Sequence, residues 1–266
     1  MSAMRLPDHS VHGSADTTVF LLHGAFGAKE YWRAQIAALA NAGYRVVAWD
    51  APGYGISPLP HTYSVEVAAE ALINLIESVG GPRNVLLGHS FGGMIAQRAY
   101  QMSSATQRAR FAGLVLSATS AAFGNPDGDF QKEFVRARVA PLDAGKRIED
   151  FLPAGVQKMM APGAAGPLVD LVKAVVVTMR PETFRAAIAA VARYEGRDVL
   201  PLICCPVLSI AGALDTTAPA SVMEKMAGKI ADAEHIAMAG VGHFGWAEQA
   251  DAYNDHVVEF LRRKCG

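Results

Sequence analysis

A serine held between glycines, directly after an apolar run, constrains this chain more than any other feature. The stretch is Gly88-His89-Ser90-Phe91-Gly92-Gly93; Val85-Leu86-Leu87 precedes it, and a helix-like run from Met94 to Tyr100 follows. Such a serine, at a turn from a strand into a helix, is typical of a nucleophile elbow. The flanking positions of so tight a turn leave no room for a Cβ, which favours glycine. The same letters also fit a glycine-rich turn with a serine that caps a helix, so the partners of Ser90 decide between the two.

The composition excludes several classes of function. The 266 residues are 51% hydrophobic and 18% charged, with a net charge of -1. This describes an ordinary globular protein without the basic field that nucleic acid or an anionic membrane requires. No apolar stretch approaches the length of a membrane span, and residues 1–12 lack the apolar region of a signal peptide. We therefore expect a cytoplasmic protein with a small-molecule substrate as its partner and no nucleic acid or membrane partner; a homodimer stays open.

The sequence gives no indication of a metal or a cofactor. Cys204, Cys205 and Cys265 do not form a disulfide framework, because two are adjacent and the third lies next to the C-terminus, so we expect reduced thiols. Metal-ligand spacings such as C-x-x-C and H-E-x-x-H are absent, and so is a phosphate-binding G-x-x-x-x-G-K-[ST] loop. We expect a protein that works without metal or cofactor.

Apolar runs alternate with helix-like segments through much of the chain. Continuous apolar strands separated by helices predict an α/β fold whose mostly parallel sheet carries helices on both faces. Ser64 is placed to cap a helix with an apolar stripe from Val65 to Val79. The expected strands are Thr18–Leu22, Arg45–Trp49, Asn84–Leu87, Gly113–Ser117, Pro206–Ala211 and Ala233–Met238.

The alternation stops between residues 120 and 196. This stretch contains short amphipathic patterns punctuated by prolines and no convincing strand. It is too apolar to be a solvated linker. We therefore predict a core domain made of residues 1–119 and 197–266, with residues 120–196 inserted as a helical cap.

Two later strand ends carry the residues that a nucleophilic serine needs. A serine hydroxyl requires a base, usually histidine, and the histidine requires an acceptor that fixes its tautomer. Asp215 follows the strand Pro206–Ala211, and His243 follows the strand Ala233–Met238. The carboxyl ends of parallel strands share one edge of the sheet, where ligands bind in open α/β sheets. Ser90, Asp215 and His243 are therefore the predicted catalytic residues.

An early loop is placed to stabilise an oxyanion. His23-Gly24-Ala25-Phe26-Gly27 follows the first confident strand. We expect the backbone amides of Ala25 and Phe91 to donate to the developing negative charge.

Together these segments resemble the α/β-hydrolase fold of the serine-hydrolase superfamily. The resemblance rests on His23-Gly24, Asp50-Ala51-Pro52-Gly53-Tyr54-Gly55-Ile56-Ser57, the Ser90 elbow, Asp215 and Gly242-His243, and it covers almost the whole chain in the family's order. It implies a structural role for His23 and for the 50–57 turn, and a helical cap over the active site. The serine argues against haloalkane dehalogenases and epoxide hydrolases, which use aspartate. Only about 17 residues precede the first confident strand, so we expect one or two of the family's N-terminal strands to be short or missing.

The substrate pocket is less readable. Phe26, Met94 and Phe244 are candidate lining residues, although each fits an ordinary position in the hydrophobic core about equally well. His89 lies next to the nucleophile and is expected to point away from it. A substrate carboxylate could be bound by a cap arginine, although the default for each is a solvated helix face; the candidates are Arg136, Arg138, Arg180, Arg185 and Arg193.

The overall pattern is most similar to the 3-oxoadipate enol-lactonase group and related small esterases. The resemblance implies a hydrolase that cleaves a small ester or lactone, such as an enol-lactone of aromatic catabolism, through an acyl-enzyme. Three alternatives stay open: a carbon–carbon bond hydrolase of the meta-cleavage type, a cofactor-free oxygenase, and a ligand receptor on the same fold.

Overall fold

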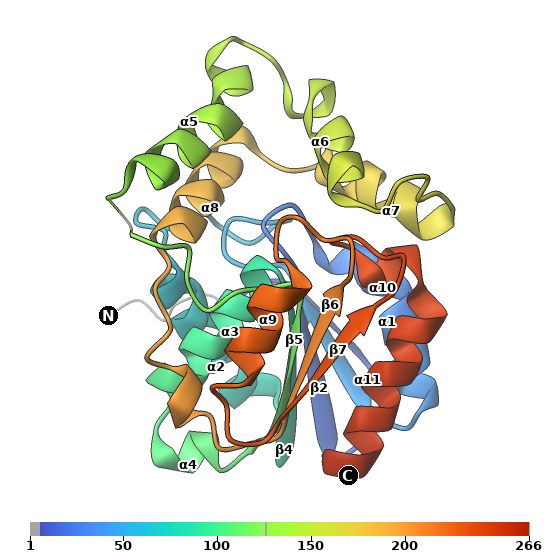
Figure 1. Cartoon of the computed structure of the whole chain (residues 1–266). Helices are drawn as coiled ribbons and strands as arrows, with labels where there is room; N and C mark the ends of the chain where they lie inside the picture. The colour runs from blue at the N-terminus through green and yellow to red at the C-terminus, as the bar shows by residue number, and fades with distance from the viewer. Residues whose placement is uncertain (1–5, 126, 266) are drawn as a thin grey trace.

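A seven-stranded sheet forms the centre of the computed structural model, which describes residues 6–125 and 127–265 (Figure 1). The strand order is β1-β3-β2-β4-β5-β6-β7; β1 runs antiparallel to β3, and the other neighbouring pairs are parallel. The strands are β1 (His9–His12), β2 (Thr17–Leu22), β3 (Arg45–Trp49), β4 (Arg83–His89), β5 (Phe111–Ser117), β6 (Val207–Gly212) and β7 (Ala233–Met238).

The predicted α/β class is confirmed, and the six expected strands are found within two residues at each end. The sequence did not predict β1, a four-residue strand that is only partly buried at the edge of the sheet. Its two histidines and its short length give none of the apolar run that marks the buried strands. The described residues thus hold one short strand ahead of β2, in line with the expected shortening at this end.

Helices cover both faces of the sheet (Figure 1). On one face α2 (Val65–Val79) packs on α3 (Phe91–Met102), while α1 (Arg33–Asn41) packs on α11 (Ala250–Lys264) on the other. The Ser64 hydroxyl accepts a hydrogen bond from the Val67 amide at 3.3 Å, which confirms the predicted cap of α2. The shorter helices of the core are η1 (Lys29–Trp32), α4 (Ala105–Arg108), η3 (Leu200–Leu202), α9 (Ala220–Ala227) and α10 (Gly245–Glu248).

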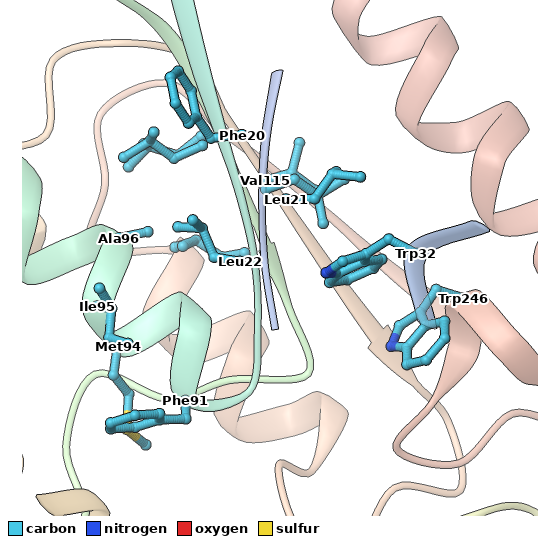
Figure 2. Packing of buried hydrophobic residues seen from close by; sticks show 14 of the residues in the cluster. Phe20, Leu21, Leu22, Trp32, Phe91, Met94, Ile95, Ala96, Val115 and Trp246 are labelled. Atoms are coloured by element: carbon cyan, nitrogen blue, oxygen red, sulfur yellow. The ribbon is translucent and has the colours of Figure 1, made fainter. Parts of the chain in front are cut away.

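Strand β2 shows why both faces must be covered. Successive side chains of a strand point to opposite faces, and residues 18–22 are all buried. Figure 2 shows Leu22 on the face that carries α3 and Leu21 on the other, the face of Trp32 and Trp246. Burial on both sides holds the carboxyl end of the sheet in place under the loops that follow it.

Four helices, here called the cap helices, lie beyond the carboxyl ends of the strands (Figure 1). In this group α5 packs on α8 and α6 on α7. The chain enters and leaves the group at one place, where Phe123 donates to the Tyr194 carbonyl at 3.0 Å and Gly196 to the Ala121 carbonyl at 2.8 Å. The cap helices are α5 (Asp129–Asp143), α6 (Leu152–Met159), preceded by η2 (Ile148–Asp150), α7 (Pro167–Val176) and α8 (Pro181–Arg193).

No helix in the described ranges is both long and apolar enough to cross a membrane.

Candidate active site

Ser90 occupies a strained turn between β4 and α3. Its φ of 53° lies in the left-handed region, which is costly for a residue other than glycine. A Cβ on Gly88 would lie 2.5 Å from the Gly92 carbonyl oxygen, and one on Gly92 would lie 2.2 Å from the Leu22 carbonyl oxygen. The two glycines therefore let α3 start directly against the ends of β2 and β4.

Hydrogen bonds to the end of β5 hold this turn. The Ser90 amide donates to the Ser117 carbonyl at 2.8 Å. The buried Thr119 hydroxyl donates to the Ser90 carbonyl at 2.7 Å. A Cβ on Gly93 would meet the Thr119 side chain at 2.7 Å, so this glycine admits the threonine. The amide and the carbonyl of Ser90 are thereby both fixed by the end of β5 and the residues that follow it.

Asp215 and His243 form a buried pair. The His243 Nδ1 and the Asp215 Oδ2 lie 2.7 Å apart, and both side chains are at most 1% exposed. The other carboxylate oxygen of Asp215 accepts from the amides of Thr217 and Ala218, at 2.7 and 3.0 Å. Burial alone would raise the pKa of Asp215, but the hydrogen bond with His243 and these amides hold it below its usual value.

An ionised Asp215 defines the tautomer of His243. A carboxylate only accepts, so Nδ1 carries a proton, and the neutral tautomer that this bond selects has its lone pair on Nε2. This is the form in which histidine can take a proton from a hydroxyl.

His89, expected to point away from the nucleophile, packs its ring against the catalytic candidate His243. The two ring centroids are 4.9 Å apart, and the ring centroids of Phe244 and Trp246 lie 5.3 and 5.8 Å from that of His89. Burial, followed by the nearby His243, lowers the pKa of His89 well below its ordinary value. A neutral His89 places no fixed positive charge beside His243.

The loop that carries His243 is tied to the cap helices. The His243 amide donates to the Met159 carbonyl, the last residue of α6, at 2.8 Å. Beside it the Glu248 carboxylate accepts three amides: Ala161 at 2.7 Å, and Gly242 and Phe244 at 2.9 Å. One side chain therefore joins the loop that carries His243 to the segment that follows α6. No sequence pattern predicts this contact, because Ala161 and Glu248 are 87 positions apart in the chain.

The early loop is held in shape by buried side chains. His23 Nε2 accepts from the Ala51 amide at 3.0 Å, so its Nδ1 is the donor to the Gly24 carbonyl at 2.8 Å. The Tyr31 oxygen accepts from the Gly24 amide at 2.7 Å, and the Tyr54 hydroxyl donates to the Ala25 carbonyl at 2.9 Å. Burial lowers the pKa of His23 and keeps this ring neutral.

Within residues 6–125 and 127–265, two backbone amides beside the cavity of Ser90 have no hydrogen-bond acceptor. Phe91 is the first residue of α3, where a helix amide has no intrahelical acceptor. The Ala25 amide likewise donates to nothing within the ranges the structure describes. Both can therefore serve a ligand.

These groups meet at a cavity of about 570 Å³, including its open mouth. Ser90 and His243 both line it, together with Ala25 and the predicted pocket residues Phe26 and Met94. Phe244, the third residue predicted for the pocket, is not among the described lining residues, because its ring is buried against His89 and His243. Sequence reasoning missed most of the remaining wall: Ala118, Thr119, Ser120, Phe123, Phe134, Met159, Ile188, Val191, Thr217 and Ala218. Arg138 completes the wall.

A parallel sheet with a serine elbow, and a histidine after its last strand, defines the class of α/β hydrolases. The alpha/beta hydrolase family model matches residues 19–256, and the chain belongs to that family. It is therefore a hydrolase, as predicted.

Relatives that span nearly the whole chain agree with this class. A Variovorax paradoxus protein described as a carbamate hydrolase is 29% identical over 265 residues, covering 96% of each chain. An esterase from Thermogutta terrifontis, solved with malate bound, is 25% identical with a TM-score of 0.80 and covers 97% of this chain and 94% of its own. The enol-lactonase from Burkholderia xenovorans shares the fold at 23% identity, with a TM-score of 0.80 and 96% of each chain covered.

Proposed function

We propose that this hydrolase cleaves a small ester or lactone through a serine acyl-enzyme, without metal or cofactor. One observation carries the proposal: Ser90 lines the same cavity as His243, which is hydrogen-bonded to Asp215 at 2.7 Å. An isolated helix-capping serine has no use for such a pair. The elbow strain at Ser90 points the same way, because unusual backbone conformations are retained where function depends on them.

In this mechanism Ser90 Oγ attacks the carbonyl carbon while its proton passes to His243 Nε2. Asp215 stabilises the imidazolium that results and does not itself take the proton. The imidazolium then protonates the leaving alkoxide, and the acyl group stays on Ser90. A water molecule next attacks the acyl carbon while giving a proton to His243. The imidazolium returns that proton to Ser90 Oγ as the bond between Ser90 and the acyl group breaks, which releases the acid and restores the hydroxyl.

The oxyanion of each tetrahedral intermediate would accept from the amides of Ala25 and Phe91. Both amides are placed at the cavity, because Ala25 lines it and Phe91 directly follows Ser90 at the start of α3. The helix N-terminus adds partial positive charge at the same point. Loss of one such donor typically costs about 10²–10³ in rate.

The relatives and the cavity favour carbonyl chemistry on a small substrate. The names of two relatives with at least 25% identity, a carbamate hydrolase and an esterase, both describe cleavage at a carbonyl carbon. The cavity walls are mostly apolar, so an acyl group with hydrocarbon character fits them. Enol-lactones belong in the first substrate screen.

Covalent labelling tests the proposal. A fluorophosphonate probe should modify one residue, Ser90, identified by mass spectrometry of the labelled peptide. Ser90→Ala should abolish labelling and lower kcat/KM for 4-nitrophenyl butyrate by about 10³-fold or more. Ser78→Ala, at an exposed position of α2, serves as the matched control and should behave as the wild type.

The alternatives give different results in the same experiment. Full esterase activity in Ser90→Ala would overturn the mechanism. Cleavage of vinylogous diketones but not of esters would assign the carbon–carbon bond reaction. Oxygen consumption without labelling of Ser90 would assign the oxygenase, and labelling without turnover of any substrate screened would leave the receptor.

A further inference from the structure

Arg138 presents an unpaired cation to the candidate active site. It lies on the cap helix α5, and its side chain lines the cavity together with Ser90 and His243. Its guanidinium stacks on the Phe134 ring, with the central carbon 3.5 Å from the ring centroid. Its one hydrogen bond within residues 6–125 and 127–265 is a long one, 3.4 Å, to the Phe134 carbonyl.

The other cap arginines are used elsewhere. Arg136 pairs with Glu133 at 2.7 Å, and Arg185 pairs with Asp143 at 2.6 Å. Arg180 donates to the Ser57 carbonyl at 3.0 Å, and Arg193 lies at a separate hollow of the surface. No carboxylate in the described part of the chain lies within ion-pair distance of Arg138, which distinguishes it from Arg136 on the same helix.

The cavity itself supplies no counter-charge. Its described lining contains no aspartate, glutamate or lysine, and seven of its residues come from the cap region (120–196), most of them apolar. Partial burial lowers the pKa of the Arg138 guanidinium, a sign that its charge is incompletely solvated. A cation in such surroundings gains more from an incoming anion than the same cation in water.

Stacking also decides how the guanidinium can bind. The Phe134 ring covers one face of the planar group and leaves its edge N–H donors available. A planar fork of donors matches a carboxylate, which can accept two parallel hydrogen bonds. Because Arg138 is the one arginine or lysine among the described lining residues and the walls are mostly apolar, the site suits a monoanionic carboxylate better than a phosphate dianion.

The geometry points to Arg138 as an anion subsite, so that the substrate of this enzyme is a half-ester or lactone bearing a free carboxylate away from the scissile carbonyl. This inference rests on the proposed Ser90 chemistry, because it takes the ester to be cleaved at Ser90. It specifies the substrate class and adds a residue that determines specificity.

A pair of substrates matched in shape but different in charge tests the inference. The 4-nitrophenyl half-esters of C4 to C8 dicarboxylic acids carry a remote carboxylate, and their methyl-capped diesters are neutral molecules of nearly the same shape. For the best chain length, the wild type should show a higher kcat/KM for the anion. Arg138→Gln should lower the anion-to-neutral ratio of kcat/KM by about 10- to 100-fold, mainly through KM, as expected for a charged hydrogen bond. Arg138→Lys should restore part of the ratio, and Arg136→Gln should leave it unchanged.

The outcomes separate this inference from the proposed function. Equal ratios in the wild type and Arg138→Gln would overturn the subsite while ester hydrolysis stands. If the wild type cleaves no ester at all, the proposed function fails, and calorimetric titration with the monomethyl adipate anion tests the subsite alone. Binding at least about 10-fold weaker in Arg138→Gln would then support it, and equal affinity would overturn it.

Discussion

Removal of the Glu248 carboxylate should both destabilise the fold and make the loop that carries His243 less rigid. Glu248→Ala leaves three amides of buried residues without an acceptor: Ala161, Gly242 and Phe244. A hydrogen bond to a charged group contributes about 1.5–3 kcal/mol, but three bonds to one half-exposed carboxylate do not add fully. We expect a loss of about 3 kcal/mol in the free energy of unfolding. For a chain of this size that corresponds to a fall in Tm of about 6–12 °C.

The same substitution should slow the reaction. The His243 amide bonds to Met159 beside the three lost contacts, so the histidine loses part of its support. Since a misplacement of about 1 Å can cost about 10²-fold, we expect kcat/KM to fall by about 10-fold or more.

The assay combines urea denaturation followed by circular dichroism with steady-state kinetics on the same preparations. Glu259→Ala is the matched control, because Glu259 is an exposed residue of α11 whose pair with Arg263 spans 3.7 Å. If Glu248→Ala lowers the free energy of unfolding by less than about 1 kcal/mol and leaves kcat/KM unchanged, this carboxylate does not hold the loop that carries His243 to the segment after α6.

Three further substitutions test other parts of the site. Asp215→Asn should lower kcat/KM by about 10³–10⁴-fold, because the asparagine favours the wrong tautomer of His243. Since the pKa of Asp215 is lowered in the folded state, the wild type should be more stable than this variant near neutral pH and should lose that advantage as the pH falls below about 4. Urea denaturation midpoints measured across this pH range check the stability difference. Gly92→Ala, which drives a Cβ to 2.2 Å from a β2 carbonyl, should cost about 3 kcal/mol or more in denaturation, whereas Gly228→Ala meets nothing closer than 3.6 Å and should be tolerated. Tyr54→Phe orphans the Ala25 carbonyl and should cost about 1–3 kcal/mol of stability with a several-fold lower kcat, and an unchanged kcat would exclude a role for Tyr54 in shaping the loop.

Local patterns predicted the sheet and the elbow. A side chain at Gly88 or Gly92 would collide with the turn itself or with the end of the neighbouring strand. The glycines of the serine motif therefore indicate this tight turn directly from the sequence. Asp215 and His243 were recognisable because each follows a strand, and parallel strands bring their carboxyl ends to one edge.

Features built between distant segments were not predictable in the same way. The choice of Arg138 among the five candidate arginines of the cap region depends on which face of α5 packs toward the cavity. Phe244 follows the histidine in sequence, yet packing against His89 takes it out of the pocket wall. The edge strand β1 was not predicted, because a strand that is only partly buried does not need a run of apolar residues.

The backbone hydrogen bonds between 121–123 and 194–196 have a consequence for how such an enzyme can change over evolutionary time. They close the intervening segment at its base, where Phe123 bonds to Tyr194 and Gly196 to Ala121. The entropic cost of a closed loop rises only slowly with its length, so helices between these points can be lengthened, shortened or exchanged at little cost to the sheet. Descendants of this chain can therefore acquire new substrate preferences while Ser90 stays unaltered, provided that the replaced helical segment keeps its two ends side by side.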